Sequence, residues 1–188
     1  MYKNGLFTNN CKTPIGDIVM ASDGIALVGL WFVGQKYFGS TIAGKSERRN
    51  LPIFKDTISW LDIYFSGNIP KFVPPLKTSG TTFQEMVWNI IKTIPYSSTM
   101  SYGEISKKLG LTTSLSARAV GAAVGRNPIS LIIPCHRVVG ANNNITGYAG
   151  GVDKKRHLLQ MESCCSDLSL VTNNLSILAP SMSNTSIV

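Results

Sequence analysis

A chain of 188 residues with 44% hydrophobic residues is long enough to bury the core of one full domain or of two small ones. Its 18 Lys and Arg residues outnumber its 10 Asp and Glu residues, and this net charge of +8 favours a polyanionic partner such as nucleic acid or an anionic surface. No apolar run approaches the roughly 20 residues that span a bilayer, and the N-terminus lacks the apolar core of a signal peptide, so we expect an intracellular protein without a membrane partner.

Cysteine usage argues against a disulfide framework and against a zinc site. Cys164 and Cys165 are adjacent, and the chain is too long for a disulfide-stapled mini-protein. Only two histidines occur, and no close pair of cysteines has the spacing of zinc ligands. We therefore expect reduced thiols and no bound metal.

The first 79 residues are predicted to form a small α/β unit. Two strand-like segments, GDIVMAS at 16–22 and IALVGLWFV at 25–33, are joined by an SDG turn that is typical of a hairpin. Apolar residues at helical spacing follow in FKDTISWLDIYFSG at 54–67. The next stretch, NIPKFVPPLKTSG at 68–80, is rich in proline and glycine without periodicity, so we expect a linker and a domain boundary near Gly80.

Residues 80–163 are predicted to form a second, mainly helical unit. The segment TTFQEMVWNIIKTIP at 81–95 carries apolar residues on one helical face and is stopped by Pro95. In SYGEISKKLG, Ser101 and Glu104 fit a capping box, and Gly110 suits the exit of a helix over about 102–109. A short turn leads to SLSARAVGAAVGRNP at 114–128, a second helix with little side-chain bulk. This is the helix-turn-helix arrangement, in which the second helix enters a DNA groove, although a slim helix can also pack tightly against protein.

The segment LIIPCHRVVG at 131–140 has the composition of a buried strand that ends in reactive side chains. A thiol is well suited to attack a saturated carbon once a base or a positive neighbour favours the thiolate, and Cys135 is followed by His136 and Arg137. Neighbours in an extended chain point to opposite faces, so the thiol and the imidazole need a water or a bend to connect them. On spacing alone, a buried structural cysteine beside a surface histidine is the plainer alternative.

Taken in order, these segments resemble the O6-alkylguanine-DNA alkyltransferases, also called methylated-DNA-protein-cysteine methyltransferases. IPCHRVV is the signature of that family, and SYGEIS, ARAVGAAVGRNP, IPCHRVVG, ITGYAGG and KKRHLLQMES follow the order of its C-terminal domain. The segment TPIGDIVMASDGIALVGLWF is similar to its first domain. The resemblance implies an α+β protein, with a small ribonuclease-H-like α/β domain and its linker at 1–79 and a mainly helical helix-turn-helix domain at 80–163.

The resemblance also implies roles in the transfer reaction. Cys135 would accept the alkyl group, His136 would act as the base through a water, and Glu162 would orient and charge the histidine. Asn127 would fix the turn and support the thiolate. Arg137 would be a structural partner within the motif.

Contacts with substrate and DNA are implied for a further group of residues. Tyr102 would donate to the base ring and help to turn the nucleotide out of the stack, and Arg118 would fill the vacated place. Tyr148 and Gly150 would belong to the loop that closes over the guanine and helps to protonate the departing oxygen. The slim helix would lie in the minor groove of double-stranded DNA with little sequence preference. The DNA contacts are assigned to Ala117, Arg118, Gly121 and Arg126.

The function implied is DNA repair. The protein would flip out O6-alkylguanine and move the alkyl group to Cys135 as a thioether, so that each molecule is consumed once and no cofactor is needed. It would act as a monomer, in the cytoplasm or, in a eukaryote, in the nucleus. Family members with a zinc site in the first domain use paired Cys and His ligands, and Cys11 has no histidine nearby, so no metal is expected.

Two other classes of protein stay open at this point. A non-catalytic helix-turn-helix protein that recognises alkylated DNA would explain the charge and the paired helices, but such relatives lack the cysteine. A thiol hydrolase would need an oxyanion hole, for which NPISLIIPCHR offers no cysteine at a helix start. Residues 164–188 lie beyond the resemblance, and their serine and asparagine content predicts a loosely ordered polar tail.

Overall fold

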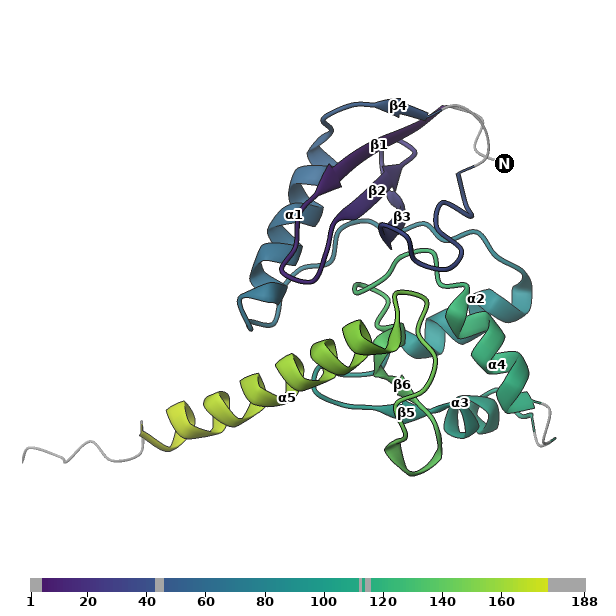
Figure 1. Cartoon of the computed structure of the whole chain (residues 1–188), viewed down its shortest axis with the longest axis vertical. Helices are drawn as coiled ribbons and strands as arrows, with labels where there is room; N and C mark the ends of the chain where they lie inside the picture. The colour runs from purple at the N-terminus through teal and green to yellow at the C-terminus, as the bar shows by residue number, and fades with distance from the viewer. Residues whose placement is uncertain (1–4, 43–45, 112, 114–115, 176–188) are drawn as a thin grey trace, which may run out of the picture.

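The computed structural model describes the backbone of residues 5–42, 46–111, 113 and 116–175, and the side chains of these residues up to 164. A sheet with one covering helix comes first along the chain, and a mainly helical part follows (Figure 1). This arrangement confirms the expected α+β class. Within the described ranges, no helix is long and apolar enough to cross a membrane.

The N-terminal unit is built on a sheet with the strand order β3-β2-β1-β4. Strands β1 (Leu6–Cys11), β2 (Ile18–Ser22) and β3 (Leu27–Phe32) pair antiparallel, and β4 (Ser46–Arg48) joins β1 in parallel. The hairpin of β2 and β3 was expected, whereas β1 and β4 were not. Their sequences, LFTNNC and SER, are largely polar and give no apolar alternation to detect.

Helix α1 (Pro52–Phe65) begins with a proline in its first turn, where the missing N–H costs nothing. It buries one face, made of Ile53, Phe54, Thr57, Trp60, Leu61 and Tyr64. That face packs with Met20, Leu30 and Phe32 of the sheet in one hydrophobic core. The expected helix at 54–67 is confirmed, displaced by two residues.

The segment predicted to be a linker lies along the outer edge of β3. The amide of Leu27 donates to Pro75 O at 2.7 Å, and the amide of Lys77 donates to Leu27 O at 2.9 Å. The proline-rich segment thus covers an edge that would otherwise present unpaired backbone groups.

The second unit contains the expected helices. Helix α2 (Thr82–Ile91) ends before Pro95, and the short β5 (Met100–Ser101) leads into α3 (Tyr102–Lys108). The capping box of Ser101 and Glu104 is confirmed, and Gly110 has the positive φ of 71° that suits the helix exit. Helix α4 (Ser116–Gly125) packs against α3, and β6 (Val138–Val139) pairs in parallel with β5.

The apolar strand expected just before Cys135 is wrong. Ile129 forms a single bridge with Leu30, Leu131 has a φ of 69°, and Cys135–Arg137 is one turn of 3₁₀ helix. The chain is diverted because the side chain of Asn127 binds the backbone of this loop, accepting from Ile129 N at 3.0 Å and donating to Ile133 O at 2.8 Å. A side chain that offers the backbone such partners competes with a strand ladder.

Helix α5 (Val152–Leu175) closes the chain and extends away from the body of the protein (Figure 1). It continues past residue 163, where the sequence suggested that the second unit ends and a loose tail begins. Residues 152–175 contain no proline or glycine, so nothing in this segment breaks the helix. The rest of the expected tail, residues 176–188, lies outside the described residues.

Candidate functional site

Cys135 lies at a cavity of about 430 Å³ between the two units. Its residue surface is only 4% exposed, but the cavity is also lined by Arg118 and Ala122, which are exposed at the surface of α4. Tyr102 and Tyr148 contribute aromatic walls to it. A planar ring with a small substituent could therefore approach the sulfur, which is buried without being sealed in.

Asn127 connects the loop to the sulfur. Its side-chain amide donates to Cys135 Sγ at 3.0 Å, in addition to its bonds to the loop backbone. A hydrogen bond to sulfur favours the anionic form. The pKa of Cys135 is raised by burial, and the hydrogen bond from Asn127 and the positive charge of Lys155 act in the opposite direction.

His136 and Glu162 form a buried pair beside the cysteine. Nε2 of the imidazole lies 2.8 Å from Oε1 of the carboxylate, and both residues are fully buried. Because the carboxylate can only accept, the proton lies on Nε2 and Nδ1 keeps its lone pair. In the described part of the chain Nδ1 has no hydrogen-bond partner, so it is free to take a proton.

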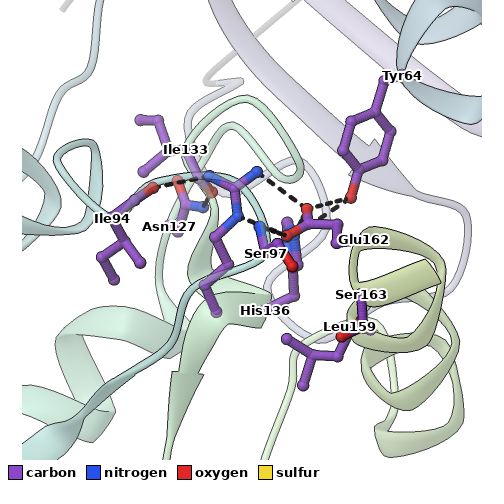
Figure 2. Close-up of polar contacts among 10 residues, drawn as sticks. Tyr64, Ile94, Ser97, Asn127, Ile133, His136, Leu159, Glu162 and Ser163 are labelled. Carbon is purple, nitrogen blue, oxygen red and sulfur yellow. Dashed lines mark hydrogen bonds and ion pairs between the residues drawn. The ribbon is translucent and has the colours of Figure 1, made fainter. Parts of the chain in front are cut away.

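Arg137 holds the same carboxylate from a second direction. Its Nε donates to Oε2 and its Nη2 to Oε1, each at 2.9 Å, and its Nη1 donates to Ile94 O at 2.8 Å. The backbone amide of Ser97 adds a bond to Oε2 at 3.2 Å. Figure 2 shows Glu162 with Tyr64, Ser97 and His136 around it. A bidentate pair of this kind fixes both the position and the plane of a carboxylate.

The electrostatics of the pair favour a neutral imidazole and a charged carboxylate. Burial lowers the pKa of His136 and outweighs the opposing hydrogen bond and charge of Glu162. Burial would raise the pKa of Glu162, but the hydrogen bonds and charges of His136 and Arg137 hold it at about 2. A neutral imidazole next to a thiol can act as a base at neutral pH.

Lys155 belongs to the site although the sequence did not single it out. It is fully buried, and its Nζ donates to the backbone oxygens of Val138, Thr146 and Gly147. Burial lowers its pKa to about 8. In KKRHLLQMES it reads as a solvated charge, yet it is three residues before Leu158 and seven before Glu162, which puts all three on one helical face.

The residues that were assigned to DNA lie on helix α4 and immediately after it. Arg118 is exposed at the cavity, and a Cβ added to Gly121 would lie 3.7 Å from the Tyr102 ring. Ala117 is half-buried one residue before Arg118. Arg126 is exposed just after α4, with its guanidinium 4.6 Å from the centre of the Tyr37 ring.

Gly150 contacts the site through Tyr148. A Cβ at this position would lie 2.8 Å from Cε1 of Tyr148 and 3.2 Å from Cδ2 of Phe32. Only glycine leaves room for the tyrosine to pack in this way. The residue assigned to substrate binding thus supports an aromatic wall of the cavity.

Two residues of the N-terminal unit also line the cavity and were not anticipated. Lys36 and Tyr37 stand in the turn after β3, where Tyr37 has a φ of 61°. The amide of Lys36 donates to Ala149 O at 2.9 Å, which joins this turn to the loop that carries Tyr148. No local signal in the sequence marks a contact between segments so far apart.

The described residues hold no group of three or more His, Cys, Asp and Glu side chains that could bind a metal ion. Cys11 lies in the N-terminal unit, where burial and then the charges of Asp62 and Asp17 raise its pKa to about 11. Such a thiol is poorly nucleophilic at neutral pH. Cys164 is exposed on α5.

Two family models match most of the chain. Residues 6–78 match the ribonuclease-like domain of 6-O-methylguanine DNA methyltransferase, and residues 82–164 match its DNA binding domain. A methylated-DNA–protein-cysteine methyltransferase of Mycobacterium leprae is 43% identical over 150 residues, covering 80% of this chain and 88% of that protein. Its counterpart in Methanosarcina acetivorans is 43% identical over 155 residues, covering 82% and 96%.

Solved structures give the same result. The crystal structure of Mycobacterium tuberculosis O6-methylguanine methyltransferase matches with a TM-score of 0.75 and 39% identity, covering 88% of this chain and 99% of that one. The structure of Mycobacterium tuberculosis OGT in complex with DNA matches with a TM-score of 0.76 and 38% identity over the same shares.

Proposed function

The chain belongs to the 6-O-methylguanine DNA methyltransferase family, and on this premise we propose that Cys135 is the residue that takes the alkyl group from O6-alkylguanine. The protein repairs DNA by transferring the alkyl group of a methylated base to a cysteine of its own. The observation that carries the choice of Cys135 is its position: its sulfur accepts a hydrogen bond from Asn127 beside a cavity, next to a neutral imidazole.

The reaction begins when Cys135 loses its proton. His136 receives it on Nδ1 through an intervening water, and Glu162 stabilises the imidazolium that forms. The thiolate then attacks the alkyl carbon, so a C–S bond forms while the C–O6 bond breaks. The electron pair of the broken bond stays on O6, and the purine takes up a proton. The thioether is not cleaved again, which makes the protein a single-turnover reagent without a cofactor.

The aromatic walls of the cavity are suited to hold the purine. Tyr102 would donate to the base ring, and Tyr148 would help to supply the proton to the departing oxygen. Burial raises the pKa of both hydroxyls, so they stay protonated and able to donate. The loop that carries Tyr148 would close over the base.

The target base is hidden in duplex DNA and must be swung out, which costs on the order of a few kcal/mol for unstacking. Arg118, exposed at the cavity, would occupy the vacated place and offset part of that cost. The small residues of α4 beside it would let the helix approach the minor groove without reading base sequence. Ala117, Gly121 and Arg126 complete this surface.

We assign the transfer chemistry to the unit that begins near Gly80, with residues 1–79 as a separate domain that supplies Tyr37 to the cavity. We expect the protein to act as a monomer on double-stranded DNA. It would work in the compartment that holds the genome, which is the cytoplasm of a prokaryote or the nucleus of a eukaryote.

Contrary to the expectation that no cysteine stands at a helix start, Cys135 begins a helical turn. That turn is three residues of 3₁₀ helix, too short to gather the aligned amides of a helix N-terminus. Membership of the methyltransferase family disfavours a hydrolase, and the presence of Cys135 disfavours a protein that only binds alkylated DNA.

A labelled-methyl assay tests the proposal. Duplex DNA with a labelled methyl on guanine O6 is incubated with the intact protein and with Cys135→Ser. We expect one label per intact molecule and none on the variant. Repeated release of label into solution would indicate a hydrolase, and label on both proteins would exclude Cys135 as the acceptor.

A further inference from the structure

A tyrosine of the N-terminal unit reaches the histidine–carboxylate pair of the second unit. The hydroxyl of Tyr64, near the end of α1, donates to Glu162 Oε1 at 2.7 Å and lies 3.3 Å from His136 Nε2 (Figure 2). Tyr64 is fully buried, and its ring stacks on Trp60 with 5.2 Å between ring centres. It is therefore held rigidly from its own helix.

The hydroxyl supplies something that the other donors do not. Arg137 and Ser97 approach the carboxylate from the second unit, whereas Tyr64 approaches it from the N-terminal unit. Oε1 has three partners, namely Nη2 of Arg137, Nε2 of His136 and the hydroxyl of Tyr64. Arg137 sets the plane of the carboxylate, and the hydroxyl adds the donor that holds Oε1 on the side of the imidazole. Without the hydroxyl, Oε1 would lose one of its buried hydrogen bonds and be held less firmly against Nε2.

We propose that Tyr64 is a positioning residue for alkyl transfer: it fixes the carboxylate of Glu162 and through it the His136 ring, so that Nδ1 stays available to the proton of Cys135. The inference rests on the proposed function of Cys135. The N-terminal domain would then contribute to the chemistry, because its fold places the hydroxyl of Tyr64 beside Glu162.

The hydroxyl of Tyr64 influences the protonation of His136, which can be followed through the pH dependence of methyl transfer. Burial, followed by the charge of Glu162, raises the pKa of Tyr64, so the residue is a neutral donor at all working pH values. The other charged groups that face the pair are Arg137 and Lys155, and a change at Tyr64 leaves both in place. Removing the hydroxyl donor leaves more negative charge on the carboxylate of Glu162, which stabilises the imidazolium and raises the pKa of His136. A stronger donor at position 64 withdraws charge from the carboxylate and lowers the pKa of His136.

The test compares two changes that alter the donor in opposite directions. Tyr64→Phe removes the hydroxyl, and site-specific replacement of Tyr64 by 3,5-difluorotyrosine keeps it but makes it a stronger donor. The quantity measured is the single-turnover rate of methyl transfer as a function of pH. Thr57→Val is the matched control, because Thr57 lies on the buried face of α1 and its buried hydroxyl donates to Ile53 O within the same helix.

We expect Tyr64→Phe to transfer about tenfold more slowly at neutral pH, with one label per molecule unchanged. The acid limb of the pH profile of Tyr64→Phe should move to higher pH, because the imidazolium is stabilised. The acid limb of the difluorotyrosine protein should move to lower pH. Thr57→Val should lower the temperature of unfolding while leaving rate and profile unchanged.

The proposal is overturned if Tyr64→Phe keeps the rate and profile of the intact protein, or if Thr57→Val slows transfer as much. If Tyr64→Phe does not fold, the difluorotyrosine protein decides alone, and an unshifted acid limb overturns the proposal. Failure of the intact protein to accept any label would instead contradict the assignment of Cys135 and is seen before any change at Tyr64.

Discussion

The side-chain amide of Asn127 lies 3.0 Å from the sulfur of Cys135, eight residues further along the chain. The same amide holds the loop between them through Ile133 O and Ile129 O. The residue that shapes the backbone of this loop is thus also the one that donates a hydrogen bond to the sulfur of the proposed nucleophile.

Asn127→Ala should therefore weaken both the loop conformation and the stabilisation of the Cys135 thiolate. Without the amide donor, the pKa of Cys135, already raised by burial, should rise further and the thiolate fraction at neutral pH should fall. A hydrogen bond to a charged group is worth about 1.5–3 kcal/mol, so alkylation of Cys135 by iodoacetamide should slow by about tenfold or more. The exposed Asn68→Ala is the control and should react at the rate of the intact protein. An unchanged rate for Asn127→Ala would show that the contact does not stabilise the thiolate.

Glu162 should make stability fall on acidification. Its pKa is held at about 2 in the folded protein against an ordinary value of 4.5, so its contribution is complete above about pH 4.5 and is lost as the pH falls towards 2. The lowered pKa of His136 acts in the same direction, beginning below its ordinary value of 6.5. The part due to Glu162 is on the order of 3 kcal/mol. Urea unfolding at a series of pH values should show a steeper loss for the intact protein than for Glu162→Gln, and parallel curves would contradict this.

Arg118→Ala should separate base flipping from chemistry. The side chain is exposed at the cavity, and we propose that it fills the place of the flipped nucleotide, so its loss should slow repair of O6-methylguanine in duplex DNA by about tenfold or more. Reaction with the free base O6-benzylguanine, which needs no flipping, should change little. Arg156→Ala is a matched control, because Arg156 is an exposed arginine on α5 that pairs with Asp153. Equal losses on both substrates would place Arg118 in the transfer step instead.

Gly150→Ala should slow alkyl transfer by displacing the ring of Tyr148. The added methyl group would come within 2.8 Å of the Tyr148 ring, so the ring must move and the cavity wall with it. We expect transfer to slow several-fold with little loss of DNA affinity. Gly103→Ala, whose added Cβ would find its nearest neighbour 3.8 Å away, should transfer at the rate of the intact protein. A normal rate for Gly150→Ala would mean that the wall is dispensable.

Much of the local structure could be predicted because its signals are local. The capping box of Ser101 and Glu104, the exit at Gly110 and the apolar face of α1 each depend on residues a few positions apart. The site proposed around Cys135 was predicted from the order of the sequence motifs that resemble the family. What could not be predicted was the loop before the cysteine, where apolar composition favours a strand and the bonds of Asn127 impose another path.

The contacts between the units were also out of reach. Tyr64 lies 98 residues before Glu162, and in the sequence it is one apolar position of an amphipathic helix. Lys155 has the pattern of a solvated charge until the fold surrounds it with backbone oxygens. Such roles arise from tertiary packing, which no spacing along the chain specifies.

The central claim is that Cys135 becomes the permanent carrier of the alkyl group. The most direct measurement is the mass of the tryptic peptide 127–137 after the protein has reacted with an excess of duplex DNA that carries O6-methylguanine. We predict that this peptide carries one methyl group in place of the thiol hydrogen, a net gain of CH2, in every molecule, with the modification on the cysteine and guanine restored in the DNA. An unmodified peptide after the DNA has been repaired, or a methyl group on another residue, would contradict the account.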